Sequence, residues 1–218
     1  AGSVIYFSDD ANLRNMMQKR CMEETRLGIP MIFGHDVIHG YRTIAPVPLA
    51  QAASWNPDLV RTISRDAAKE AYYGGLDWTF SPMVDIARDP RWGRVMEGYG
   101  EDPYLTSVFC KAAVEGYQGD DLSAEGSIAA CLKHFVGYGA SEAGRDYVYT
   151  EISDQVLWDT YLPSFHAGVE SGAATVMSAF NNISGIPASA NKYTMTDVLK
   201  KKWNWDGMIV SDWDAVIQ

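Results

Sequence analysis

Short apolar runs alternate along the chain with longer amphipathic stretches. The short runs have the length and the flanking turn residues of buried β-strands, and they lie at residues 30–33, 76–80, 128–132, 174–177 and 208–210. The longer stretches predict helices at residues 12–26, 57–73, 103–117, 154–171 and 194–203. Strands that alternate with helices predict βα units, and therefore an α/β fold with parallel strands.

Two of the predicted helices have well-marked starts. Asn56 precedes Pro57, and Asp102 precedes Pro103. A short polar side chain can cap the free N–H groups of a helix, and proline suits the first helical position because its missing N–H would be unpaired there anyway. These pairs predict N-caps at Asn56 and Asp102.

Polar clusters follow the predicted strands, at residues 34–40, 81–102, 133–147, 178–185 and 211–214. In a (β/α)8 barrel the active site is built from several such loops at the carboxyl ends of the strands. A doubly wound nucleotide-binding fold concentrates its chemistry at one glycine-rich turn, and the chain contains neither GxGxxG nor GxxxxGK[ST]. The pattern favours a (β/α)8 TIM-like barrel. It is expected to be incomplete, because eight units usually need about 250 residues.

Composition narrows the possible partners. The 218 residues are 47% hydrophobic, which suits a single domain over residues 1–218. The net charge of −10 and the lack of a large basic cluster argue against a nucleic-acid partner. No apolar run approaches the roughly 20 residues of a membrane span, so no membrane partner is expected. Cys110 and Cys131 lie in apolar patterns and are expected to be buried free thiols.

Asp36 follows the strand predicted at residues 30–33 and is a candidate for binding sugar hydroxyl groups. Its structural alternative is a cap on the next helix. His35 and His39 have an i, i+4 spacing, but they lie at a strand-to-loop junction and not on one helix face, so a metal site is not expected here.

The long loop at residues 81–102 contains Arg88, Arg91 and Arg94. Arginine can hold hydroxyl groups or carboxylates with its planar fork, or it can stiffen a loop through salt bridges. The second role is favoured for Arg88 and the first for Arg94, while Arg91 fits both. Trp92 is either a stacking surface for a sugar or a packing residue.

Lys133 and His134 end the apolar run at residues 128–132. Neighbouring side chains on a strand point to opposite faces, but at the end of a barrel strand both can reach the mouth. A buried lysine needs a partner, which a ligand or an acid supplies. Arg145, in the following loop, is a candidate to clamp the ligand or to pair with Asp36 or Asp212. Met177 is a candidate lining residue, although core packing is the simpler interpretation.

Asp212 and Trp213 follow the last predicted strand. An aspartate at a barrel mouth can attack an anomeric carbon and form a glycosyl–enzyme intermediate. Nearby cations such as Arg94, Lys133 or Arg145 are expected to keep it ionised.

The strings GHDVIHG, DPRWGR, EGYGEDP, KHF and VSDW occur here in the order found in glycoside hydrolase family three, which the chain resembles from about residue 28 onward. The resemblance implies a retaining exo-β-glycosidase, of β-glucosidase type with possible β-xylosidase activity, acting on oligosaccharides or β-glucosides without a cofactor. It implies Asp212 as nucleophile. It implies that the non-reducing sugar is held by Asp36, Arg94, Lys133 and His134, with Arg145, Met177 and Trp213 nearby.

The same resemblance implies an α/β-sandwich domain that follows the barrel, supplies the general acid/base and is absent from these residues. Glu97, Glu101 and Glu142 lie near arginines that should hold them ionised, which is unsuitable for an acid. The loop after Lys133-His134 lacks a further histidine, which argues against hexosaminidase activity. A periplasmic or secreted location is the family expectation.

Two other functions remain open at this point. A metal-assisted barrel hydrolase or deaminase needs a cluster of histidines and acids, and the chain has 4 histidines. A carbohydrate-binding fragment without catalysis needs the same sugar-binding residues but no working nucleophile.

Overall fold

The computed structural model describes residues 2–8 and 10–216. Its framework is two three-stranded parallel sheets. A parallel bridge between Trp78 and Ala129 joins them, and the N–H of Thr79 donates to the Ala129 carbonyl at 2.9 Å. The strands follow one another in the order β1 (Ser3–Ile5), β2 (Ile32–His35), β3 (Trp78–Thr79), β4 (Cys131–Phe135), β5 (Thr175–Ser178) and β8 (Met208–Ser211).

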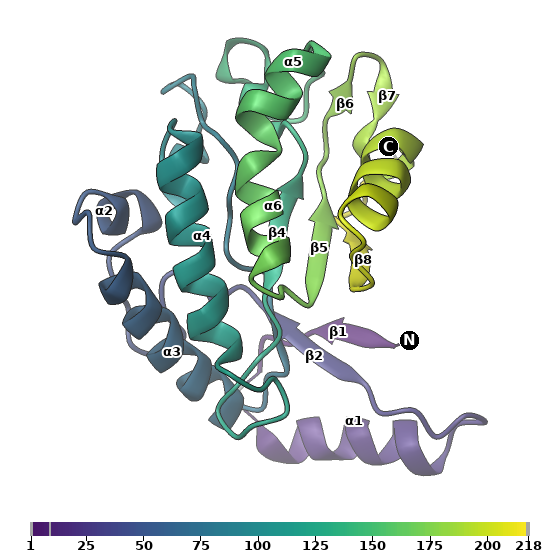
Figure 1. Ribbon diagram of the computed structural model, residues 1–218. Helices are drawn as coiled ribbons and strands as arrows, with labels where there is room; N and C mark the ends of the chain where they lie inside the picture. The colour runs from purple at the N-terminus through teal and green to yellow at the C-terminus, as the bar shows by residue number, and fades with distance from the viewer. Residues whose placement is uncertain (1, 9, 217–218) are drawn as a thin grey trace.

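Helices connect these strands and gather on one side of them. Figure 1 shows α3, α4 and α6 side by side over one face of the strands, with α1 lying apart near the N-terminal strands. The helices are α1 (Ala11–Glu23), α2 (Pro48–Ala52), α3 (Pro57–Tyr73), α4 (Pro103–Gln118), α5 (Asp154–Val156) and α6 (Pro163–Glu170). Two π-helical segments span Leu157–Tyr161 and Tyr193–Lys202, and short 3-10 turns span Val95–Glu97, Tyr138–Ala140, Glu142–Gly144 and Ala188–Ala190.

The α/β class with parallel strands is confirmed, and each predicted strand and helix has a counterpart. The helix predicted at residues 57–73 is α3 itself, and the predicted caps are present. Asn56 Oδ1 accepts the N–H of Leu59 at 3.2 Å, and Asp102 Oδ1 accepts the N–H of Leu105 at 2.6 Å. Each capped helix starts with proline, as the pattern predicted.

The helix predicted at residues 154–171 is wrong as a single element. It consists of α5, the π-helical segment Leu157–Tyr161 and α6. Proline has no N–H to donate to the preceding turn and its ring crowds that turn, so the break falls just before Pro163. The sequence prediction also omitted β1, α2 and the hairpin of β6 (Asn182–Ile183) and β7 (Ile186–Pro187).

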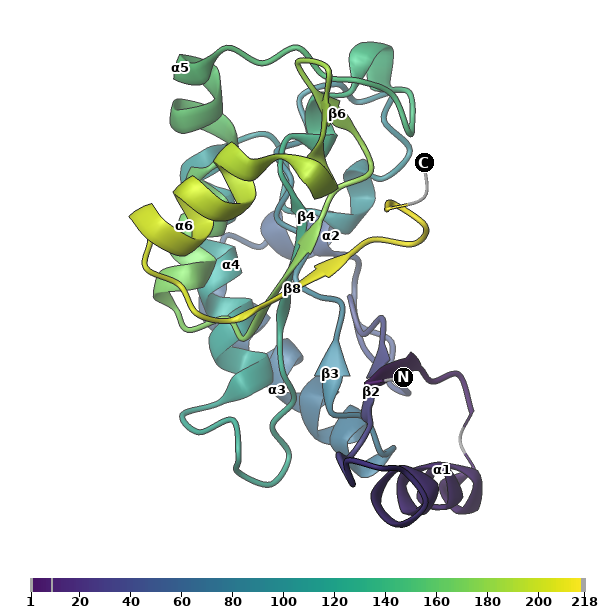
Figure 2. The same ribbon diagram turned by 90° about the vertical axis from the view of Figure 1, so that its right-hand side faces the viewer.

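The main core lies between the strands and the helices α3, α4 and α6. Phe33, Leu132 and Val176 from the strands are fully buried beside Phe109 and Phe165 from the helices. Burying a side chain of this kind contributes about 1.5–3 kcal/mol relative to leaving it exposed. Cys110 and Cys131 are buried and free, as predicted. β1 and β8 are the two outer strands of the series, and Figure 2 shows β4 and β8 above β2 and β3. None of the helices among the described residues has the length and apolar character needed to span a bilayer.

Candidate functional site

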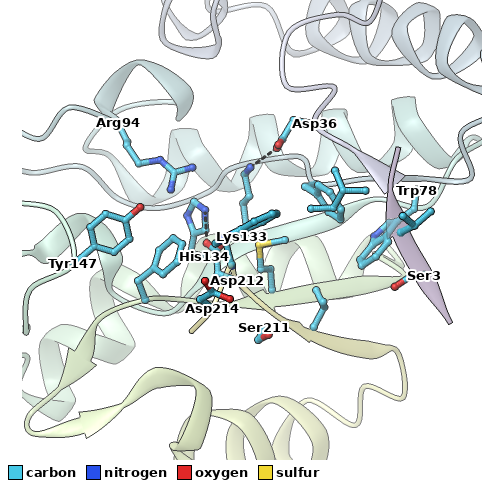
Figure 3. Close-up of a pocket in the computed structure, with 17 residues that line it drawn as sticks. Ser3, Asp36, Trp78, Arg94, Lys133, His134, Tyr147, Ser211, Asp212 and Asp214 are labelled. Carbon is cyan, nitrogen blue, oxygen red and sulfur yellow. Dashed lines mark hydrogen bonds and ion pairs between the residues drawn. The ribbon is translucent and has the colours of Figure 1, made fainter. Parts of the chain in front are cut away.

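A pocket of about 460 Å³ lies where several strands end (Figure 3). It receives side chains from β4, β5 and β8 and from the residue that follows β2. Seven of the eight residues predicted for the site line this pocket, namely Asp36, Arg94, Lys133, His134, Met177, Asp212 and Trp213. Strand ends therefore bring together residues that are far apart in sequence, as the βα pattern predicted.

Asp36 and Lys133 form an ion pair in the pocket. Asp36 is the first residue after β2, and its Oδ1 accepts a hydrogen bond from Lys133 Nζ at 2.7 Å. The lysine side chain is 5% exposed while the aspartate side chain is 55% exposed. Asp36 is thus the partner that the buried lysine needs, and its carboxylate is still open to a ligand. Its structural alternative, a helix cap, is not what the structure shows, because α2 starts at Pro48.

Lys133 and His134 are neighbours on β4, yet both line the pocket. The pairing of β4 with β5 shifts register between Leu132 and Phe135. Such an irregularity re-aims side chains that would otherwise alternate between the two faces of a sheet. It accounts for the convergence of both residues, which the sequence analysis had attributed to the strand end alone.

His134 is held from behind by Asp85. Oδ2 of Asp85 accepts the backbone N–H of His134 at 2.9 Å and lies 2.8 Å from the ring nitrogen Nδ1. The other ring nitrogen, Nε2, lies 3.3 Å from Oδ2 of Asp212. Burial lowers the pKa of His134 well below its usual value, and the charges of Arg94 and Lys133 act in the same direction.

Asp212 lies immediately after β8, and its side chain is 13% exposed. Its Oδ1 accepts the N–H of Trp213 at 2.6 Å. Burial raises the pKa of Asp212 above the ordinary value, while that N–H and the charges of Lys133 and Arg94 lower it. The two cations thus act in the predicted direction, but burial has the larger effect.

Arg94 enters the pocket from the long loop between β3 and α4. Its guanidinium makes a two-pronged ion pair with Glu97, at 2.7 and 2.8 Å. The sequence left open whether Arg91 and Trp92 contact a ligand or have structural roles, and both have structural contacts. Arg91 pairs with Asp89 at the surface, and Trp92 is 1% exposed and packs edge-on against Tyr138.

Arg145 is the predicted residue that the structure does not place among the residues lining the pocket. It is exposed, and its Nε donates to the Glu142 carbonyl at 3.3 Å. The sequence placed it near the site because its loop follows β4. That loop instead carries Tyr147 into the pocket, where its ring meets Phe180 edge-on at 4.7 Å.

Three further residues at or behind the pocket, Asp85, Tyr147 and Phe180, were not predicted from the sequence. Tyr147 and Phe180 lie in polar loops after β4 and β5, and aromatic residues in such loops were a signal that was not used. Asp85 follows a buried apolar pair, Met83-Val84, which is the context that singled out Asp36 and Asp212.

His35 and His39, the two histidines considered for a metal site, make contacts within the protein. His39 Nδ1 lies 2.9 Å from the Ala45 carbonyl, and His35 packs edge-on against the rings of Phe7 and Tyr41. No group of three or more histidine, cysteine, aspartate or glutamate side chains within residues 2–8 and 10–216 is arranged to hold a metal ion.

Parallel strands with a polar pocket at their ends place the chain among the α/β proteins that bind or transform small polar molecules at that edge. Residues 2–218 match the glycosyl hydrolase family 3 N terminal domain, and the chain belongs to this family.

Solved structures and curated relatives agree with this assignment. The β-glucosidase from Listeria innocua in complex with isofagomine superposes with a TM-score of 0.95 at 47% identity, covering 100% of this chain and 31% of that one. The periplasmic β-glucosidase of Salmonella typhimurium is 44% identical over 92% of this chain and 26% of its own length. A β-xylosidase of Formosa agariphila is 36% identical over 93% of this chain and 30% of its own length. The chain thus spans less than a third of these relatives.

Proposed function

We propose that this chain carries the nucleophile-bearing part of a retaining exo-β-glycosidase that removes terminal non-reducing β-linked glucose, with β-xylosides as a second substrate class. The observation that carries the proposal is the position of Asp212. Its carboxylate lies at the end of β8 in a pocket that also contains Lys133, Asp36 and Arg94. The relatives named β-glucosidase and β-xylosidase support the same substrate classes.

The reaction follows from the groups around Asp212. Its carboxylate attacks the anomeric carbon while the bond from that carbon to the leaving oxygen breaks and the leaving oxygen takes a proton from an acid. Water then attacks the glycosyl–enzyme ester and gives up a proton to the same group, so the starting configuration is retained. Asp36, Lys133 and Arg94 would hold sugar hydroxyl groups, with Met177, Trp213 and His134 shaping the site. Arg145 would act only if its loop moved toward a bound ligand.

The proton donor is proposed to lie outside these residues. Besides Asp212, the carboxylates that line the pocket among the described residues are Asp36, which pairs with Lys133, and Asp214, which is exposed. An acid needs apolar surroundings that raise its pKa toward neutrality. We place the donor in a following α/β-sandwich domain, in keeping with the greater length of the relatives.

The six parallel strands are proposed to be part of a (β/α)8 TIM-like barrel, forming one domain over residues 1–218. The strand order and the polar strand ends support this view. A periplasmic or secreted location is proposed on the printed name of the Salmonella relative.

Trapping of the nucleophile tests the proposal directly. The chain would be incubated with 2,4-dinitrophenyl 2-deoxy-2-fluoro-β-glucoside, whose leaving group needs little acid assistance and whose fluorine slows hydrolysis of the ester. We expect a covalent sugar on the peptide that contains Asp212, and no label on the Asp212→Asn variant. Asp206→Asn, an exposed aspartate just before β8, is the matched control and should label normally.

The second candidate is a carbohydrate-binding fragment without catalysis, favoured by the short coverage of the relatives. It predicts that glucose protects the pocket residues from chemical modification while no label forms. A label on a carboxylate other than Asp212 would contradict the assignment of the nucleophile.

A further inference from the structure

Asp85 lies outside the pocket and contacts it through His134. Both side chains are 1% exposed. The same oxygen of Asp85, Oδ2, meets the backbone N–H of His134 at 2.9 Å and the ring nitrogen Nδ1 at 2.8 Å. The other oxygen, Oδ1, is buried without a hydrogen-bond partner among the described residues. The contacts of Asp85 are therefore concentrated on one histidine.

The far side of the ring faces Asp212. Nε2 lies 3.3 Å from Oδ2 of Asp212, and this oxygen is buried without a hydrogen bond among the described residues. In proteins without bound substrate such hydrogen bonds are often long or misaligned, and they tighten in the complex. A bare Nε2 and a carboxylate oxygen of Asp212 would be two buried acceptors facing each other, which is unfavourable. Nε2 therefore needs to carry a proton.

A neutral ring carries one proton, and its position depends on Asp85. If Nδ1 held the proton, Nε2 would turn a lone pair toward the carboxylate of Asp212. Burial, the largest effect, raises the pKa of Asp85 to about 7, and the charge of Glu97 acts in the same direction. The N–H of His134 and the charges of Arg94 and Lys133 lower this pKa. Burial also lowers the pKa of His134. Below the pKa of Asp85, a protonated Asp85 donates to Nδ1 and the proton of the neutral ring stays on Nε2. Above that pKa, an ionised Asp85 accepts Nδ1–H and Nε2 is bare, so the Nε2–H donor belongs to the protonated pair.

We propose that Asp85 is a positioning residue for the glycosidase reaction: it fixes His134 as an Nε2–H donor to Oδ2 of Asp212. Together with the N–H of Trp213 on Oδ1, this donor holds both oxygens of the nucleophile. The carboxylate is thereby aimed before the sugar arrives and kept ionised by a hydrogen bond to its charged form. The proposal rests on the proposed function for its catalytic consequence but not for the position of the proton.

Asp85→Asn gives a sharp test because the backbone N–H of His134 selects the orientation of the new amide. Its oxygen has to replace Oδ2, since the NH2 group would face another donor. That oxygen then requires a proton on Nδ1, and a neutral ring must leave Nε2 bare. The variant is nearly isosteric, yet it is expected to reverse the tautomer of His134.

The first readout is 15N NMR of the imidazole nitrogens, with the signals of His134 identified among the 4 histidines by comparison with His134→Gln. At about pH 6, below the pKa of Asp85, we expect a protonated Nε2 in the unaltered chain and a protonated Nδ1 with a bare Nε2 in Asp85→Asn. Asp89→Asn is the matched control, because Asp89 lies on the same loop and pairs with Arg91 at the surface. A bare Nε2 in the unaltered chain would overturn the proposal, whether or not any variant folds.

The second readout is hydrolysis of 2,4-dinitrophenyl β-glucoside as a function of pH. Asp85→Asn should lower kcat/KM about 100-fold, since an amide in place of a carboxylate behind a histidine gives the wrong tautomer. The acid limb should move to higher pH by about one unit, because Asp212 loses a donor to its charged form. A uniform loss with an unchanged pH profile would show a merely structural role and overturn the proposal. If the unaltered chain hydrolyses nothing but the tautomer reverses in Asp85→Asn, the proton position stands and the proposed glycosidase function fails.

Discussion

Lys133 brings a positive charge into the protein, with its side chain 5% exposed and its ammonium 2.7 Å from Asp36. A buried charge that loses its partner keeps the full cost of its desolvation. The pair therefore links the proposed sugar binding to local order. A substitution at Asp36 should affect more than one hydrogen bond to a hydroxyl group.

Asp36→Ala is expected to lower kcat/KM for dinitrophenyl β-glucoside about 100-fold or more, because losing a charged contact whose partner stays buried costs about 3 kcal/mol. Steady-state kinetics measure the effect. Asp66→Asn, an exposed aspartate on α3, is the control and should leave kcat/KM unchanged. Near-normal kcat/KM in Asp36→Ala would mean that its carboxylate only neutralises Lys133.

The shifted pKa values of Asp85 and His134 also predict how the free energy of unfolding depends on pH. The pKa of Asp85 is about 7 in the folded chain against 3.8 ordinarily, so the folded state binds the extra proton between these values. Its contribution to the free energy of unfolding therefore falls as pH rises through that range. The pKa of His134 is shifted below 6.5, so below that pH the unfolded state binds more protons and stability rises with pH. In the unaltered chain the two slopes oppose each other.

Asp85→Asn removes the first slope and keeps the second. We expect its free energy of unfolding to rise more steeply between about pH 4 and 6.5 than that of the unaltered chain. Urea unfolding at several pH values measures both curves, and their difference cancels the contributions of other groups. Parallel curves would show that the folded and unfolded chains bind this proton alike.

Among the elements, α3 and α4 pack closely because of one glycine. A Cβ added at Gly116 would lie 2.6 Å from the carbonyl oxygen of Arg61 and 2.6 Å from Cβ of Ser64. Alanine is favoured over glycine within a helix by about 1 kcal/mol. Here the contacts are with the backbone and the stem of α3, which cannot move away without separating the two helices.

Gly116→Ala is expected to lower the free energy of unfolding by about 1–3 kcal/mol, the usual cost of overpacking. Thermal or urea unfolding provides the measurement. Gly93→Ala is the control, because a Cβ at Gly93 meets nothing within 4 Å. If Gly116→Ala stabilised the protein, the two helices would have to separate at little cost, and the higher helix propensity of alanine would determine the change in stability.

Elements that depend on neighbouring residues could be predicted from the sequence, whereas features that depend on distant strands could not. The pairs Asn56-Pro57 and Asp102-Pro103 were sufficient for two helix starts because capping involves only neighbouring residues. The tight turn of the β6–β7 hairpin, with positive φ at Ser184 and Gly185, had a local Ser-Gly signal that was not used. The register shift in β4 depends on its pairing with β5, so no local pattern could predict how Lys133 and His134 converge.

The same distinction applies to the site. Asp36 and Asp212 could be predicted because each directly follows an apolar strand. Asp85 contacts His134, 49 positions away along the chain, and Arg145 does not line the pocket although its loop follows β4. Strand ends specify which residues meet, whereas loop paths and buried supports depend on packing across the whole domain.

At the scale of the whole molecule, the six strands place one nucleophile candidate in the pocket, and among the described residues that line it no other carboxylate has surroundings suited to an acid. Glu97 is tied to Arg94 at 2.7 Å, and Glu142 is exposed. A general acid contributes about 10²–10⁴-fold to rates of this kind. The dependence on the leaving group should therefore show whether these residues contain the donor.

We expect the chain to hydrolyse 2,4-dinitrophenyl β-glucoside and to act on cellobiose about 10²–10⁴-fold more slowly than a complete relative does. Without a general base, water should attack the glycosyl–enzyme slowly, and azide should accelerate turnover and yield the β-glucosyl azide, since this anion needs no proton removed. Chromatography of the products measures both effects, and Asp212→Asn should abolish both. Cellobiose turnover comparable to that of the complete relative, lost in Glu97→Gln, Glu142→Gln or Asp214→Asn, would place the acid within these residues and contradict the assignment of the donor to a following domain.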